Sequence, residues 1–88
     1  MKLGKEEKEL LRSLDCQERD FAQIERALRV SMTTYKLGNK RISRERAIEL
    51  LGKRVFLSGV ARSAFHGTAT RETAVGKIVL FNSFNLFR

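Results

Sequence analysis

The fold is decided by residues 41–82, which read RISRERAIELLG (41–52), KRVFLSGVARSAFH (53–66) and, after a glycine, TATRETAVGKIVLFN (68–82). The first two segments have the apolar spacing of short helices, and the third has two runs of strand-forming residues around a turn. Helix, helix and hairpin in this order are the outline of a winged DNA-binding domain. We therefore predict an α+β, winged-helix-like fold, with residues 1–88 forming a single domain.

Residues 44–51 carry the clearest helix signals in the chain. The Ser43 hydroxyl can accept a hydrogen bond from a free backbone N–H of the first turn, and Glu45 suits the positive end of the helix dipole. Gly52 is expected to end the helix. The inward face would be formed by Ala47, Ile48 and Leu51.

A further helix is expected over residues 53–65, with Gly67 ending it. Gly59 costs about 1 kcal/mol in a helix interior relative to alanine, which indicates a kink or a close approach to a neighbouring element. Helical spacing places Leu57, Val60, Ala61, Ala64 and Phe65 on the buried side, and Val55, Ser58, Gly59, Arg62 and Ser63 on the opposite side.

The C-terminal part predicts a two-stranded antiparallel hairpin. Residues 68–73 and 78–81 would be its strands, and the connection at 74–77 has Gly76 at a left-handed position. Two strands alone are marginally stable, so we expect the hairpin to rest on the helices. Phe84, Leu86 and Phe87 are expected to fold back onto the core; otherwise they form an exposed patch suited to a partner.

The N-terminal segment predicts one long amphipathic helix over residues 5–35, although Asp15 and Cys16 offer a break into two shorter helices. Residues 37–40 then form a linker. The helical seam consists of Leu10, Leu14, Phe21, Ile24 and Leu28, continued by Gln17, Ser31 and Tyr35. Such a seam can pair with a second copy in a homodimer, or pack onto the protein's own core. We favour the core, because a small domain needs that apolar surface.

The chain is strongly basic, with a formal net charge of +8 over 88 residues. Residues 1–40 hold nine basic and seven acidic side chains, whereas residues 41–88 hold nine and three. The excess favours encounters with polyanions such as nucleic acid, although a solvated surface that keeps the protein soluble is an equal interpretation. A single cysteine, the lack of a signal-peptide pattern and the lack of a membrane-length apolar run predict a cytoplasmic protein without a membrane partner.

A winged interpretation assigns nucleic-acid contacts to four basic residues: Arg54, Arg62, Arg71 and Lys77. Arg62 would face bases or phosphates from the second helix, and the other three would contact phosphates. Two observations oppose it. Ala47 and Gly52 lie five positions apart, where a helix-turn-helix has four, and the helix offers no outward Asn or Gln for reading adenine.

No segment carries the signature of a catalytic or metal site, and we expect no enzyme activity, no cofactor and no small-molecule substrate. Ser63 lies one turn before His66, but no carboxylate is near in sequence to orient that histidine. Asp15 and Glu18 beside Cys16 would raise the pKa of its thiol instead of activating it.

The stretch RISRERAIELLG…FLSGVARSAFHGTATRET…GKIVLFNS resembles small uncharacterised accessory proteins carried by conjugative transposons of Gram-positive gut bacteria. The resemblance covers residues 41–87, and FLSGVARSAFH is its most distinctive part. It implies a mobile-element context and transfers no functional residue.

Our leading expectation is therefore a small non-enzymatic, DNA-binding or regulatory accessory protein of a mobile element, with double-stranded DNA as its partner. The alternative is a protein-interaction module that uses the N-terminal seam, as a homodimer or with another protein, or the apolar C-terminal residues.

Overall fold

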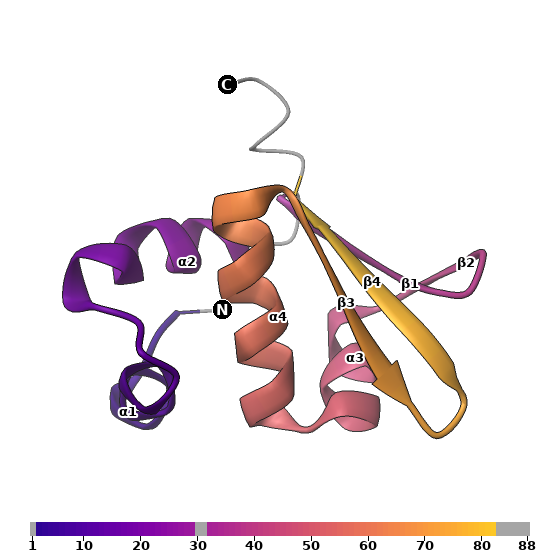
Figure 1. The fold of residues 1–88 in the computed structure, drawn as a ribbon, viewed down its shortest axis with the longest axis horizontal. Coiled ribbons are helices and arrows are strands. Elements are labelled where there is room, and N and C mark those ends of the chain that lie inside the picture. Colours follow the sequence, from indigo (N-terminus) through magenta and orange to yellow (C-terminus); the bar gives the residue numbers. More distant parts are fainter. Residues whose placement is uncertain (1, 30–31, 83–88) are drawn as a thin grey trace.

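Four α-helices lie on one side of a four-stranded antiparallel sheet, with α4 between the sheet and the α1–α2 layer (Figure 1). The structure is a computed structural model that describes residues 2–29 and 32–82. The sheet order is β2-β1-β4-β3. The α+β class is confirmed, but the prediction of a two-stranded sheet is wrong. The elements are α1 (Lys5–Ser13), the 3-10 helix η1 (Glu18–Asp20), α2 (Phe21–Ala27), β1 (Thr33–Leu37), β2 (Lys40–Ile42), α3 (Arg44–Leu51), α4 (Lys53–His66), β3 (Thr68–Thr73) and β4 (Gly76–Asn82).

The continuous N-terminal helix predicted over residues 5–35 is wrong. α1 ends at Ser13, and Asp15 takes a left-handed backbone with φ of +66°. The Cys16 N–H then bonds back to the Leu11 carbonyl at 3.0 Å, which is the pattern of a Schellman cap. Aspartate is one of the few residues other than glycine that enter this region readily. The break at Asp15 and Cys16, the alternative in the sequence, is what the structure contains.

The last part of the expected helix is a strand, and the expected linker is a turn. Thr33, Thr34 and Tyr35 are β-branched or aromatic, and β1 is paired on both sides, by β2 and β4. Leu37 pairs with Lys40, so only two residues connect β1 to β2. The first is Gly38, whose φ of +62° is what a type II′ hairpin turn requires. Pairing on two sides outweighs the modest helix propensity of this segment.

α3 and α4 occupy the expected ranges. The Ser43 hydroxyl caps α3 by accepting a hydrogen bond from the Arg46 N–H at 3.1 Å. Gly52 alone separates the two helices, and Gly67 follows the end of α4. The β3–β4 hairpin has Gly76 at positive φ, as predicted.

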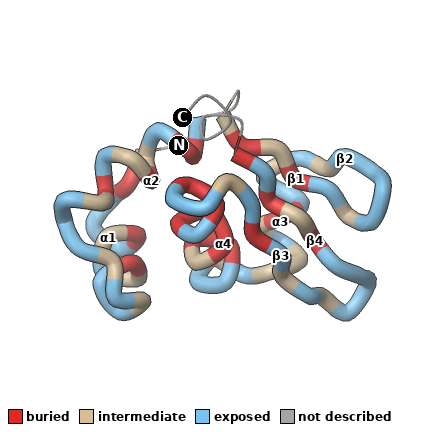
Figure 2. The backbone as a smooth tube through the Cα atoms, turned by 45° about the horizontal axis from the view of Figure 1, so that its top comes forward, coloured by how far each residue is buried: buried red, intermediate tan, exposed pale blue. Residues whose placement is uncertain are grey.

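α4 is buried on two sides, which corrects the burial predicted for it. It lies between the sheet and the α1–α2 layer, and half of its 14 residues are buried (Figures 1 and 2). Phe56 is fully buried against Tyr35, with ring centroids 5.6 Å apart. Gly59 and Ser63, expected outside, are buried, whereas Phe65, expected inside, is 40% exposed. A helix with two packed faces does not show the single apolar stripe from which burial was predicted.

The N-terminal seam is used by the protein's own core. Phe21, Ile24 and Leu28 are buried there, and Leu11 takes the fully buried position in α1 while Leu10 is only half-buried. Gln17 is exposed. Ser31, Phe84, Leu86 and Phe87 lie outside the described residues, so their expected packing is not tested. Within residues 2–29 and 32–82, the helices are too short or too polar to cross a bilayer.

Candidate nucleic-acid interface

The outward face of α4 forms the floor of a groove of about 320 Å³. The connection from α1 to η1 forms one wall, and β3 lies on the other side of the helix (Figure 1). Side chains on the floor include Ser58, Arg62 and His66, and Arg71 reaches the groove from β3. The structure therefore brings two of the four predicted nucleic-acid residues, Arg62 and Arg71, to one place.

Arg71 is held against α4 by a helix residue. Its Nε donates to Ser58 Oγ at 3.2 Å, and its Nη1 donates to the Thr70 carbonyl at 2.9 Å. Gly59 allows this close approach, because a Cβ atom there would lie 3.1 Å from both Leu80 methyl carbons and 3.5 Å from Arg71 Cγ. The glycine that interrupts the helical pattern thus marks contact with the sheet, one of the two interpretations its position suggested.

Arg62 is exposed and forms no ion pair or hydrogen bond with the described part of the chain. Arg71 likewise has no carboxylate partner among the described residues. Two guanidinium groups that form no ion pair within the described residues, carried by a helix and a neighbouring strand, are suited to binding an anion.

Arg54 and Lys77 do not line the groove. Arg54 lies two helical turns before Arg62, roughly 12 Å along the axis, and its Nη1 donates to Ser13 Oγ at 2.8 Å. Lys77 lies on the β3–β4 hairpin and faces Glu72 across the strands, with Nζ 3.8 Å from the carboxylate. Both side chains of this ion pair are largely exposed, so the pair is weak and open to exchange.

The wall opposite β3 is acidic. Asp15 and Asp20 line the groove beside Cys16. Burial raises the pKa of the Cys16 thiol, and the two carboxylates raise it further. The thiol is therefore held in its unreactive, protonated form, as expected, although Asp20 and not Glu18 is the second carboxylate involved.

Ser63 and His66 do not form a catalytic pair. Ser63 is fully buried and donates to the Val60 carbonyl at 2.9 Å, whereas His66 is exposed at the end of α4. Within the described residues no cluster of histidine, cysteine or carboxylate side chains could hold a metal ion.

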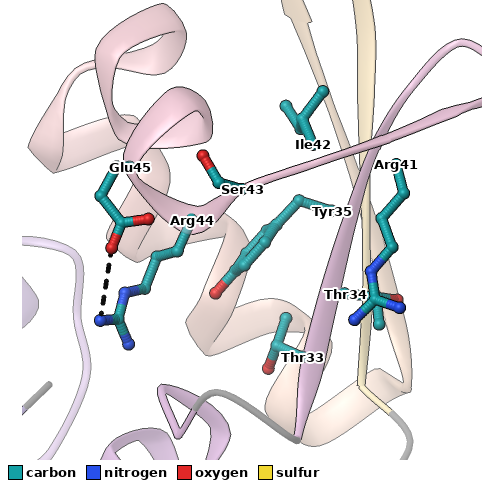
Figure 3. A pocket seen from close by; sticks show the side chains of 8 residues that line it. All are labelled: Thr33, Thr34, Tyr35, Arg41, Ile42, Ser43, Arg44 and Glu45. Atoms are coloured by element: carbon teal, nitrogen blue, oxygen red, sulfur yellow. Dashed lines mark ion pairs between the residues drawn. The ribbon is translucent and has the colours of Figure 1, made fainter.

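A second basic surface was missed by the sequence reasoning. Residues 33–42 contain Lys36, Lys40 and Arg41 and no carboxylate. Figure 3 shows Arg41 beside Thr34 on one side of β1, with the Tyr35 ring on the other side. The signal was present in the sequence as two strand-forming runs around Gly–Asn, a typical hairpin turn.

The hollow drawn in Figure 3, about 240 Å³, lies between β1 and the start of α3. Burial raises the pKa of Tyr35 to about 12, so its hydroxyl stays protonated at neutral pH. Arg44 is held by the Leu28 carbonyl, to which its Nη1 donates at 2.8 Å, and lies near Glu45. Tyr35 and Arg44 thus support the fold at this hollow.

No family model, curated protein or solved structure matches the chain.

Proposed function

We propose that the chain is a small non-enzymatic protein that binds double-stranded DNA through the outward face of α4 and the β3–β4 hairpin. The observation that carries the proposal is the meeting of Arg62 and Arg71 at one groove, without carboxylate partners in the described residues. A helix and a neighbouring strand that each present a guanidinium group can engage successive phosphates or a base edge and a phosphate.

The connectivity supports this proposal. β1 precedes α3 and α4 and pairs with β4, whose other neighbour is β3. A strand, two helices joined by a short turn, and a hairpin that shares the strand's sheet follow the element order of the winged-helix-like domain that we propose, with β2 as an added edge strand. On this proposal the exposed side of α4, which carries Arg62, would enter the major groove, and the β3–β4 turn would be the wing.

The charges of the groove define how a duplex would approach. Asp15 and Asp20 repel phosphates from the α1 side, so the DNA backbone would lie toward β3. Lys77 on the hairpin can exchange its exposed partner Glu72 for a phosphate. Arg54 lies at the start of α4, one of the places where a recognition helix meets the backbone.

A regulatory accessory role in a mobile element is part of the proposal. It rests on the resemblance of residues 41–87 to accessory proteins of conjugative transposons. DNA binding is the activity in such a setting that Arg62 and Arg71 support.

Fluorescence anisotropy with a random-sequence DNA duplex tests the proposal. Arg62→Glu should weaken binding by at least tenfold at low salt, and Arg71→Gln should weaken it to a smaller extent. Lys5→Glu is the matched control for Arg62→Glu, because Lys5 is exposed on α1, does not line the groove and carries the same charge. Circular dichroism checks that each variant is folded. Equal losses in Arg62→Glu and Lys5→Glu would reject a defined site.

The alternative function, a protein-interaction module that uses the N-terminal seam, would need the apolar residues of the seam to be exposed. Ile24 and Leu28 are fully buried in the protein's own core, so they are not offered to a second copy.

A further inference from the structure

The face of the sheet that points away from the helices is uncovered by the described residues (Figure 1). In β4, Ile78, Leu80 and Asn82 are buried toward the helices. The strand alternates, so Val79 and Phe81 point to the other face. Phe81 is 37% exposed although it lies on a central strand with neighbours on both sides.

The register surrounds Phe81 with small polar side chains and places cations beside it. Phe81 pairs with Thr34 on β1 and Thr68 on β3, so both of its cross-strand neighbours are small. Two residues earlier on β4, Val79 pairs with Lys36 of β1, and Lys36 in turn pairs with Arg41 of β2. An aromatic ring and two cations therefore share this face of the sheet, together with the ion pair of Lys77 and Glu72.

The pairing of Lys36 with Arg41 is unfavourable for the fold alone. Like charges directly opposite one another in an antiparallel pair are destabilising. Neither side chain has a carboxylate partner within the described residues, and the hairpin that carries them contains no acid. A polyanion bound on this face would neutralise both charges at once.

We propose that this face binds single-stranded DNA, with a base stacked on Phe81 and phosphates at Lys36 and Arg41. An exposed aromatic on a central strand of a four-stranded sheet, flanked by cations, suits a splayed single strand, because every base has a stacking face and the cations follow the backbone. A duplex hides its base faces and would not use the ring. The choice of DNA over RNA rests on the proposed function of the α4 groove. The proposal of a single-strand site on this face does not rest on that function.

The dimensions fit such a strand. Adjacent strands lie about 4.8 Å apart, and residues i and i+2 about 7 Å apart. Arg41 is thus two strands from the Val79 position, roughly 10 Å, and Phe81 lies about 7 Å further along β4. One nucleotide on the ring and its neighbouring phosphates span this area.

Anisotropy titration of the full chain with fluorescein-labelled decathymidylate tests the inference. Phe81→Ala should weaken binding by about tenfold or more, as loss of one stacked base does, while Phe81→Tyr should retain it. Replacing both Lys36 and Arg41 by alanine should reduce the salt slope of log K by about 1.4, the value for two phosphate contacts on a single strand.

Lys36→Glu separates a binding role from a structural one. It turns the Lys36–Arg41 pair into one of opposite charges, so the melting temperature should rise while affinity for decathymidylate falls. A fall in both would show that Lys36 supports the fold. Arg62→Glu, the variant that tests duplex binding, should leave decathymidylate binding within about twofold, so the two proposals fail independently.

Four results would overturn the inference. The first is unchanged affinity for decathymidylate in Phe81→Ala and Lys36→Glu. The second is tighter binding of decauridylate than of decathymidylate. The third is self-association that Phe81→Ala abolishes, which would place a second copy of the protein on this face. The fourth concerns residues 83–88: amide shifts of Val79 and Phe81 that change on Phe84→Ser in free protein would identify that segment as the occupant.

Discussion

Arg71 of β3 donates a hydrogen bond from Nε to Oγ of Ser58 on α4, at 3.2 Å. The bond joins the hairpin to the helix at the groove that both elements line. It also restrains a long side chain beside Arg62, so that less conformational entropy is lost when an anion binds. The groove is therefore partly organised before an anion binds.

Removing that restraint should weaken duplex binding without unfolding the protein. Ser58→Ala leaves both arginines in place and should raise the Kd for a random duplex about three- to tenfold, as expected for one hydrogen bond of roughly 1 kcal/mol. Ser13→Ala is the comparison variant, because it removes the hydrogen-bond partner of Arg54, the proposed phosphate contact that lies outside the groove, and we expect it to cause the smaller loss. A larger loss in Ser13→Ala would move the main binding surface from the groove to the start of α4.

Neutralising the acidic wall should have the opposite effect. Asp15→Asn keeps a side chain that tolerates the left-handed backbone and removes one charge that faces the groove. We expect about two- to fivefold tighter duplex binding at low salt, as loss of a nearby charge repulsion predicts. Glu9→Gln changes the net charge equally on the exposed part of α1, and an equal gain there would contradict a local effect.

We predict that contact with the sheet, and not helix propensity, decides which side chains are tolerated at position 59. Alanine would gain about 1 kcal/mol of propensity, but its Cβ would lie 3.1 Å from the methyl carbons of the fully buried Leu80. We expect Gly59→Ala to be near neutral and Gly59→Val to lower the free energy of unfolding by about 1–3 kcal/mol through overpacking. Urea unfolding measures both. A stabilised Gly59→Val would show that α4 is free to move from the sheet.

The ion pair between Glu7 of α1 and Lys53 of α4 should make stability depend on acid pH. Lys53 lowers the pKa of Glu7, with a further contribution from the Gly4 N–H, which donates to its carboxylate at 2.8 Å. A carboxyl group with a lowered folded-state pKa stabilises the fold above its unfolded pKa of about 4.3, and this contribution disappears as pH falls through the folded value.

Glu7→Gln should therefore reduce the melting temperature at neutral pH, and the difference from the parent protein should vanish in acid. Glu9→Gln is the control, since Glu9 is exposed and forms no ion pair among the described residues. A difference that persisted at low pH would assign the effect to packing instead of charge.

Local signals in the sequence located α3, α4 and the β3–β4 hairpin. The Ser43 cap, the glycines that follow the helices and the apolar run at 78–81 each act over a few neighbouring residues, so they are visible without tertiary structure. The seam residues Ile24 and Leu28 were also correctly assigned to the core.

The remaining features depend on contacts between distant residues. Residues 33–37 become a strand because β4, more than forty positions later, pairs with them. The two buried faces of α4 arise only once the sheet and α1–α2 are both in place, which is why Gly59, Ser63 and Phe65 were assigned to the wrong sides. Arg62 and Arg71 could each be predicted as nucleic-acid contacts from the sequence. That they meet at one groove, with an acidic wall opposite, could be seen only in the folded structure.

The measurement that tests the central claim most directly is a titration of isotope-labelled protein with a random DNA duplex, followed by amide NMR at low and near-physiological salt. The account predicts shifts centred on Ser58, Arg62, His66 and Arg71 that weaken as salt rises, because counterion release drives the binding. Absence of shifts at low salt, or shifts confined to residues outside α4 and the β3–β4 hairpin, would contradict it.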